Sequence, residues 1–263
     1  MEKIAFITGS GAVENAWVPI LTALKGDAEY NIDSDGANCF FARLVYLMRF
    51  YATGTFPDAK EHAQICLKMV KDIKAKISCS LLLAEEKKQI RARKELDTIL
   101  NKFIFSEVHE SFFITTNWDT VIDTAIEEHI KSNFPFYTSN IQFLHLHGCI
   151  THPQSLYLPS EVIREAYRSS EEDIEMGALH GAAWSTIEQC NKTILYGLSL
   201  DPLDAELSHT LSVGWSSPNL KEIIIINPDH KKVSQRIKLL LDSRYPAKII
   251  GYSSFHLNEK FEY

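Results

Sequence analysis

The chain has 263 residues, of which 45% are hydrophobic, enough to bury one sizeable core. Its net charge of -7 excludes a protein that binds nucleic acid mainly through phosphate contacts, because such binding needs clustered lysine and arginine. The densest basic stretch, KKQIRARK at 87–94, follows two glutamates in a helical pattern and is interpreted as a solvated helix face.

Five cysteines, none of them in a C-x-x-C pair, argue against a tetrathiolate zinc site and against a disulfide framework. We expect reduced, mostly buried thiols, no bound metal and a cytoplasmic protein. The N-terminal MEKIAFITGSG meets glycine too early for a signal peptide. No stretch approaches the ~18 apolar residues of a membrane span, so no membrane association is expected.

The first predicted strand is KIAFIT at 3–8, an apolar run that GSG ends, as is typical of a buried parallel strand. A helix is expected at 16–24. From about 37 to 110, apolar positions recur at helical spacing without strand signals, which predicts a helical insertion longer than an ordinary crossover. The apolar stripes of the insertion fit either a lid or packing layer, or an oligomer interface.

Strands and helices then alternate to the end of the chain. Strands are predicted at 112–116, 141–148, 192–197, 222–227 and 247–252, and helices at 120–130, 160–170, 180–190, 203–212 and 230–242. The pattern predicts one α/β domain over 1–263, a doubly wound, Rossmann-like parallel sheet with a helical insertion at approximately 37–110.

Small and polar residues stand where the predicted strands end. Ligands of open parallel sheets bind outside the carboxyl ends of the strands, so we expect these residues to converge on one crevice. In chain order they are Gly9-Ser10-Gly11, Thr116-Asn117-Trp118-Asp119, His145-Leu146-His147-Gly148, Gly197-Leu198-Ser199 and Asn227.

The first two of these segments have plain structural alternatives. The loop after the first strand lacks the third glycine of the dinucleotide fingerprint, so it is either a phosphate cradle or an ordinary tight turn. Asn117 or Asp119 could simply cap the helix that begins near Thr120.

The later segments have alternatives of the same kind. Strand alternation places His145 and His147 on one face, where either could be a structural hydrogen-bond donor rather than a catalyst. Asn227 could merely start the turn that Pro228 fixes.

Taken in order, the strand ends resemble the motifs of the sirtuin family. GSGA is similar to its Gly-Ala-Gly phosphate loop, TTNWD to its Thr-Gln-Asn-x-Asp element and LHG to its catalytic-histidine element. YGLSL is similar to its Gly-Thr-Ser-Leu strand end, and IIIIN to the segment whose asparagine meets the adenosine ribose. The resemblance covers 3–16 and 112–252 and leaves the helical insertion unmatched.

Two departures from the family pattern narrow what the resemblance implies. Val13 stands where the first loop usually carries a serine. Only Cys149 and Cys190 lie between the histidine and the next strand, so the zinc module of the deacylating members is absent. The chain therefore looks more like the zinc-free, helix-inserted branch of bacterial antiphage systems, whose members hydrolyse NAD.

The resemblance thus implies an NAD+ glycohydrolase that releases nicotinamide and ADP-ribose, with Asn117 and His147 as its catalytic residues. We prefer His147 to His145 because of the adjoining Gly148 and the resemblance. The chemistry agrees, because nicotinamide leaves as a neutral molecule and needs no general acid. An amide can orient a water, and an imidazole can take its proton. The expected dinucleotide-binding residues are Gly9, Ser10, Gly11, Thr116, Asp119, Gly197, Ser199 and Asn227.

The same resemblance implies a biological setting. We expect an abortive-infection effector that depletes NAD+, assembles as a homo-oligomer and relies on a separate sensor, such as a hexameric DNA-translocase-type ATPase. Direct binding to nucleic acid is not expected. Two alternatives stay open: a non-catalytic module that binds NAD or ADP-ribose and regulates a partner, and an NAD-dependent protein deacylase that works without zinc.

Overall fold

The computed structural model describes residues 2–25, 33–106, 109–136 and 141–263. Its centre is a seven-stranded sheet in the order β5-β4-β1-β6-β7-β8-β9, in which every pairing is parallel except that of β8 with β9. The predicted α/β, Rossmann-like fold is confirmed. The strands are β1 (Glu2–Thr8), β4 (His109–Thr115), β5 (Phe143–His145), β6 (Lys192–Tyr196), β7 (Glu222–Ile226), β8 (Lys248–Ser253) and β9 (His256–Glu262).

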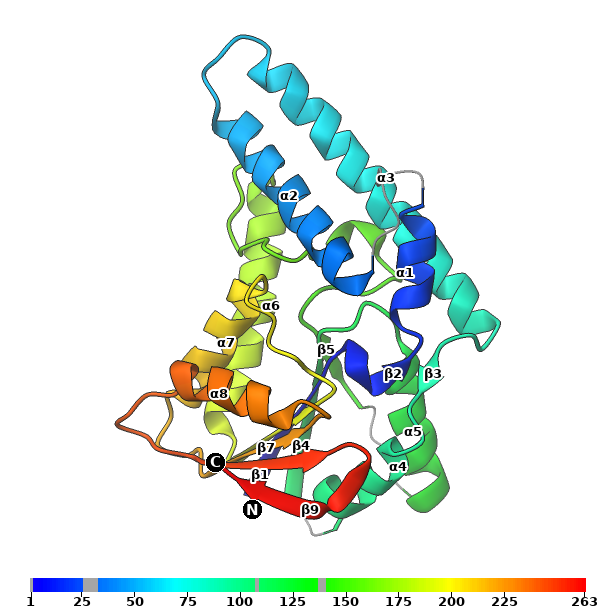
Figure 1. The fold of residues 1–263 in the computed structure, drawn as a ribbon, viewed down its shortest axis with the longest axis vertical. Helices are drawn as coiled ribbons and strands as arrows, with labels where there is room; N and C mark the ends of the chain where they lie inside the picture. The colour runs from blue at the N-terminus through cyan, green and yellow to red at the C-terminus, as the bar shows by residue number, and fades with distance from the viewer. Residues whose placement is uncertain (1, 26–32, 107–108, 137–140) are drawn as a thin grey trace.

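Helices cover both faces of this sheet (Figure 1). Along β1, Ile4 and Phe6 belong to one buried cluster and Ala5 and Ile7 to the other, and all four side chains are fully buried. Burial on both faces explains why the parallel strands read as continuous apolar runs. The first cluster includes residues of α1 (Trp17–Ala23) and α5 (Val121–Asn133), and the second those of α6 (Ser170–Gln189), α7 (Ala205–Trp215) and α8 (His230–Leu240).

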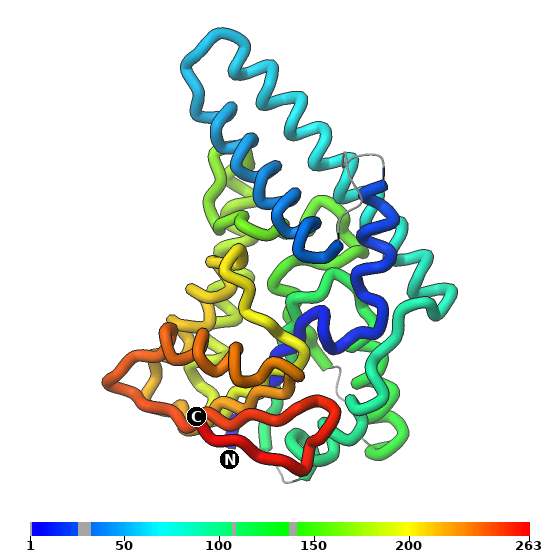
Figure 2. The backbone as a smooth tube through the Cα atoms, in the orientation of Figure 1, coloured from blue at the N-terminus to red at the C-terminus, as the bar shows by residue number. Residues whose placement is uncertain are grey.

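The helical insertion is a long hairpin of α2 (Ser34–Thr53) and α3 (Ala59–Glu86) that extends away from the sheet (Figures 1 and 2). Aromatic side chains near its tip are exposed, among them Tyr46 and Phe50. Residues 107 and 108, near the predicted end of the insertion, lie outside the described residues.

The basic stretch at 87–94 is not a helix face, contrary to the prediction. α3 ends at Glu86, and the chain then forms β3 (Arg91–Ala92), which pairs antiparallel with β2 (Val13–Glu14) next to the end of β1. From there α4 (Leu96–Ile99) and the π-helical turn η2 (Leu100–Ile104) lead toward β4. The end of the insertion is therefore attached to the loop that follows the first strand.

Two other predicted elements differ from the structure. The predicted helix at 160–170 is a loop, because its charged side chains turn inward into a buried polar network, and the capping box lies further on, between Ser169 and Glu172 at the start of α6. The predicted strand at 141–148 pairs with β4 only over Phe143–His145. Strand β9 was not predicted, because its mostly exposed, charged residues lack an apolar pattern.

The cysteines are free thiols, but the prediction that most are buried is wrong. Cys39 and Cys79 are exposed, Cys66 and Cys149 are half-buried, and Cys190 is buried. In the described part of the chain, no helix has both the length and the apolar composition needed to cross a membrane.

The register of the sheet aligns the carboxyl ends of its parallel strands. Thr8 of β1 pairs with Thr115 of β4 on one side and with Tyr196 of β6 on the other. His145 and Ile226 continue the same row on β5 and β7. Along the chain, β4 and β5 are added on one side of β1, and β6 and β7 are then added on its other side. The topological switch point of the sheet therefore lies between β1 and β6.

Candidate functional site

A cavity of about 400 Å³ opens at this switch point. Its volume lies within the ~300–1,000 Å³ typical of small-molecule sites. The insertion supplies part of the wall, through Asn38 of α2, Leu81 of α3 and Arg93 after β3. All predicted site residues except the buried Gly9 line this cavity, namely Ser10, Gly11, Thr116, Asn117, Asp119, His147, Gly197, Ser199 and Asn227.

Asn117 is the most unusual side chain of the cavity wall. The residue is only 5% exposed, yet neither its Oδ1 nor its Nδ2 atom has a hydrogen-bond partner among the described residues. Its backbone, in contrast, is well held: the N–H donates to Oγ1 of Thr115 (3.1 Å) and the carbonyl contacts Nδ1 of His145 (3.1 Å). Leaving a buried polar group unpaired costs about 1–3 kcal/mol. The backbone of Asn117 is therefore held in place, while its side-chain amide makes no hydrogen bond that serves the fold.

Two carboxylates, rather than Asn117, cap the helix that follows. Oδ1 of Asp119 accepts a hydrogen bond from the backbone N–H of Val121 (3.2 Å). Oε1 of Glu85, from the end of α3, accepts one from the backbone N–H of Thr120 (2.6 Å). Glu85 could not be found from sequence, because it precedes Thr120 by 35 positions. The capping alternative thus holds for Asp119, which also lines the cavity, and fails for Asn117.

Asp119 combines a cap with an unusual ionisation. The pKa of its carboxyl is raised to about 7, mainly by burial and also by the nearby charges of Glu85 and Asp123, while the hydrogen bond from Val121 acts in the opposite direction. Near neutral pH this carboxyl is therefore present in both its protonated and its ionised form. It can donate or accept a hydrogen bond at the cavity wall.

His147 lines the cavity beside a carboxylate that the sequence analysis missed. Its Nε2 atom lies 3.2 Å from Oδ2 of Asp204, close enough for an ion pair but not aligned as a hydrogen bond. Burial, the largest single effect, lowers the pKa of His147, but the interactions with Asp204, the negative charge of Glu161 and the backbone of Thr116 together outweigh it, and the pKa is raised overall. Asp204 is the N-cap of α7, where it accepts from the N–H of Leu207 (3.3 Å). The only sequence signal for Asp204 was that an aspartate in DPLDAEL could cap a helix.

His145 serves the fold instead. Its Nδ1 atom contacts the carbonyl of Asn117 at 3.1 Å, and its Nε2 atom lies 2.6 Å from Oδ2 of Asp123 on α5. The prediction that His145 and His147 share a strand face is wrong, because β5 ends at His145 and His147 lies in the turn that follows. Gly148 makes that turn possible, with a φ of 75° and no room for a Cβ, which would come within 2.1 Å of the Ser155 carbonyl oxygen.

The glycines of the first loop allow close packing rather than anion binding. The N–H of Gly9 donates to the carbonyl of Tyr196 (3.0 Å), and that of Gly11 to the carbonyl of Gly197 (2.9 Å). A Cβ on Gly11 would lie 2.7 Å from the Gly197 oxygen. These two N–H groups are not available to a phosphate, contrary to the expectation, and Ser10 and Gly11 are the exposed residues of the loop.

Asn227 also differs from Asn117. Its Nδ2 atom donates to the carbonyl of Leu198 (3.1 Å), and its Oδ1 atom accepts from the N–H of Asp229 (2.8 Å). Its amide therefore holds the loop after β6 and starts the turn after β7, as the structural alternative expected. Ser199 lies exposed at the rim, where its carbonyl accepts from Arg236 (2.7 Å).

No protein-family model and no curated protein sequence matches this chain. The resemblance to the sirtuin family therefore rests on the ordered strand-end motifs, and the function has to be argued from the geometry of the cavity.

Proposed function

We propose that the protein is an NAD+ glycohydrolase that cleaves the bond between nicotinamide and ribose, giving nicotinamide and ADP-ribose. The observation that carries this proposal is the buried amide of Asn117, unpaired in the same cavity as the imidazole of His147. The motif order at the strand ends supports the dinucleotide as the ligand. Cleavage of this bond passes through an oxocarbenium-like transition state, as in glycoside hydrolysis.

Asn117 and His147 have complementary tasks in this reaction. The amide of Asn117 offers a donor and an acceptor that do not titrate, suited to orienting a water or a ribose hydroxyl. The neutral imidazole of His147 takes the proton from that oxygen. The carboxylate of Asp204, 3.2 Å from Nε2, stabilises the imidazolium that forms.

Asp119 suits the nicotinamide end of the substrate. Because the pKa of its carboxyl is raised to about 7, the side chain can pair with either the oxygen or the amino group of the nicotinamide carboxamide. Nicotinamide leaves as a neutral molecule, so no general acid is required, and Asp119 acts by orienting the ring. Thr116 and Ser10 face the same cavity, and Ser199 and Asn227 line its adenosine side in this proposal.

The antiphage role rests on the motif order and on the missing C-x-x-C pairs. In that setting, a separate polypeptide would recognise the trigger, and the exposed aromatic residues near the tip of the α2–α3 hairpin would serve assembly. These parts of the proposal are independent of the chemistry of the cavity.

The direct test is product analysis. Purified protein is incubated with NAD+, alone and with its native-host partners, and nicotinamide and ADP-ribose are quantified for the wild type, Asn117→Ala and His147→Ala. We expect each substitution to reduce turnover by at least about 100-fold, the size typical of a lost transition-state contact. Asn133→Ala is the matched control, because this exposed asparagine lies at the end of α5 away from the cavity.

Two results would contradict the proposal. Full turnover by Asn117→Ala would show that the site is wrongly assigned. Tight binding of NAD+ without turnover, with partners present, would favour the regulatory binding module instead.

A further inference from the structure

In the described part of the chain, the wall of the cavity carries four carboxylates and a single permanently cationic side chain. The carboxylates belong to Asp35, Asp119, Asp201 and Asp204, and the cation is Arg93. A ligand with two phosphates needs positive charge, and in the first loop the backbone N–H groups of Gly9 and Gly11 are already engaged with carbonyl oxygens.

Arg93 is held firmly beside that loop. Its backbone N–H donates to the carbonyl of Ala12 (3.1 Å), and its Nε donates to the carbonyl of Gly11 (2.7 Å). These two anchors leave the terminal nitrogens of the guanidinium group for another partner. The nearby carboxylate of Glu14 is bonded to Arg91 (2.6 Å), and within the described ranges Arg93 itself forms no ion pair.

A second incompletely bonded group lies on the same wall. The side chain of Tyr196, at the end of β6, lines the cavity and is only 1% exposed. Its hydroxyl makes no aligned hydrogen bond with the described residues, although the carboxylate of Glu95 interacts with it. Tyr196 and Gly11 lie on opposite sides of the switch point between β1 and β6, where doubly wound folds bind phosphate groups. An anion between them would satisfy both the hydroxyl and the guanidinium.

We propose that Arg93 binds the pyrophosphate of the dinucleotide, with the hydroxyls of Tyr196 and Ser10 as further donors. This inference rests on the proposed function in taking a dinucleotide as the ligand. Guanidinium groups suit phosphate because they donate paired, charge-assisted hydrogen bonds. The carboxylates of Asp119 and Asp204 favour the cationic nicotinamide ring and disfavour phosphate, so the charges of the cavity also set the direction in which the dinucleotide lies.

The inference gives the helical insertion a function. Arg93 comes from its last part, which the pairing of β3 with β2 attaches to the end of β1. The insertion thereby supplies the positive charge that the first loop lacks, and the sequence stretch KKQIRARK contains a ligand contact rather than only solvated residues.

The experiment is calorimetric titration of the full chain with ADP-ribose, which has two phosphates, and with adenosine, which has none. We expect Arg93→Met to weaken ADP-ribose binding roughly 10- to 100-fold, as for a lost charge-assisted hydrogen bond. Arg93→Lys should restore part of the affinity, and adenosine binding should stay unchanged. Arg43→Met is the matched control, since Arg43 of α2 is exposed and does not line the cavity.

Three results would overturn the inference: Arg93→Met binding ADP-ribose within about twofold of the wild type, an equal loss for ADP-ribose and adenosine, or no binding of ADP-ribose by the wild type. Thermal unfolding of each variant checks that it is folded. ADP-ribose binding requires no bond cleavage, so an affinity that depends on Arg93 would support this inference even if NAD+ is not hydrolysed. Conversely, hydrolysis of NAD+ that does not depend on Arg93 would refute this inference and leave the proposed function intact.

Discussion

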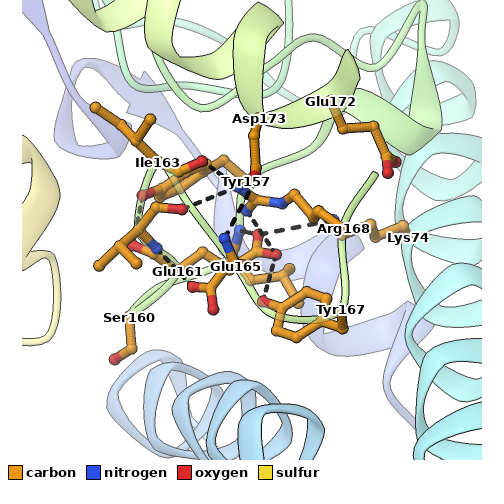
Figure 3. A network of polar contacts seen from close by, with 12 residues as sticks. Lys74, Tyr157, Ser160, Glu161, Ile163, Glu165, Tyr167, Arg168, Glu172 and Asp173 are labelled. Atoms are coloured by element: carbon orange, nitrogen blue, oxygen red, sulfur yellow. Dashed lines mark hydrogen bonds and ion pairs between the residues drawn. The ribbon is translucent and has the colours of Figure 1, made fainter. Parts of the chain in front are cut away.

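Two buried polar regions of this protein both contact Tyr157 and differ in how completely they are paired. On one side, Glu161 is bonded through both carboxylate oxygens: Oε1 accepts from Tyr167 (2.9 Å) and Arg168 (2.9 Å), and Oε2 accepts from the N–H of Leu158 (2.6 Å) (Figure 3). On the other side, the ring of Tyr157 stacks on His147 at the cavity, where the amide of Asn117 has no protein partner.

The paired region has a structural purpose. Lys74 of α3 lies 3.7 Å from Oε2 of Glu161, and Arg49 of α2 donates to Glu165 and to the carbonyl of Ser160. These contacts attach the helical hairpin to the loop at 156–169 that the sequence predicted as partly helical. The comparison teaches that polar groups which pair with each other specify the structure, whereas those held in place without a partner indicate a ligand.

The largest effect is expected from breaking the paired region. Glu161→Ala leaves Lys74 and Arg168 buried without their carboxylate, which should lower the free energy of unfolding by about 3–5 kcal/mol. Urea denaturation measures it, and Glu128→Ala, on the exposed face of α5, should change stability by less than about 0.5 kcal/mol. A loss for Glu161→Ala no larger than for the control would mean that the network contributes little to the fold.

The next effect concerns the partly paired His147. Because the base must be neutral, the rate rises with pH through the pKa of His147. That pKa is raised above its ordinary 6.5 despite burial, and Asp204 is the strongest of the groups that raise it. Asp204→Asn keeps the helix cap but removes the charge, so the acid limb of the pH–rate profile should move to lower pH. We expect the rate at its optimum to fall about 10-fold, a loss of orientation rather than of the base itself.

This prediction is checked by kcat/KM for NAD+ measured between pH 5 and 9, and it also separates two roles of Asp204. A profile that keeps its shape while the rate falls would show that Asp204 acts only as the cap of α7.

The smallest change in stability is expected for Asn117, the unpaired amide at the cavity. Asn117→Ala removes two polar atoms that have no partner in the described structure, so the free energy of unfolding without ligand should not fall by more than about 1 kcal/mol. The same substitution is expected to reduce turnover by at least about 100-fold, which separates activity from stability. A stability loss above about 2 kcal/mol would reveal a structural role for this amide and weaken the site.

The sheet and the convergence of its strand ends could be predicted because both follow from local patterns. IIIIN and FFITT are apolar, β-branched runs that end in polar residues, and a parallel sheet brings such ends to one edge. The loop at 160–169 could not be predicted, because Glu161 and Glu165 appear as exposed helix residues until Lys74 and Arg49 arrive from the distant hairpin.

The sequence by itself determined which side chains stand at the mouth of the sheet: an amide after β4, a histidine after β5 and a second amide after β7. Only the tertiary structure decided that the amide of Asn117 is free while that of Asn227 is bonded, and that His147 rather than His145 lines the cavity. The physical reason is that a polar group's hydrogen bonding depends on atoms from remote segments, as the positions of Glu85, Arg93 and Asp204 show.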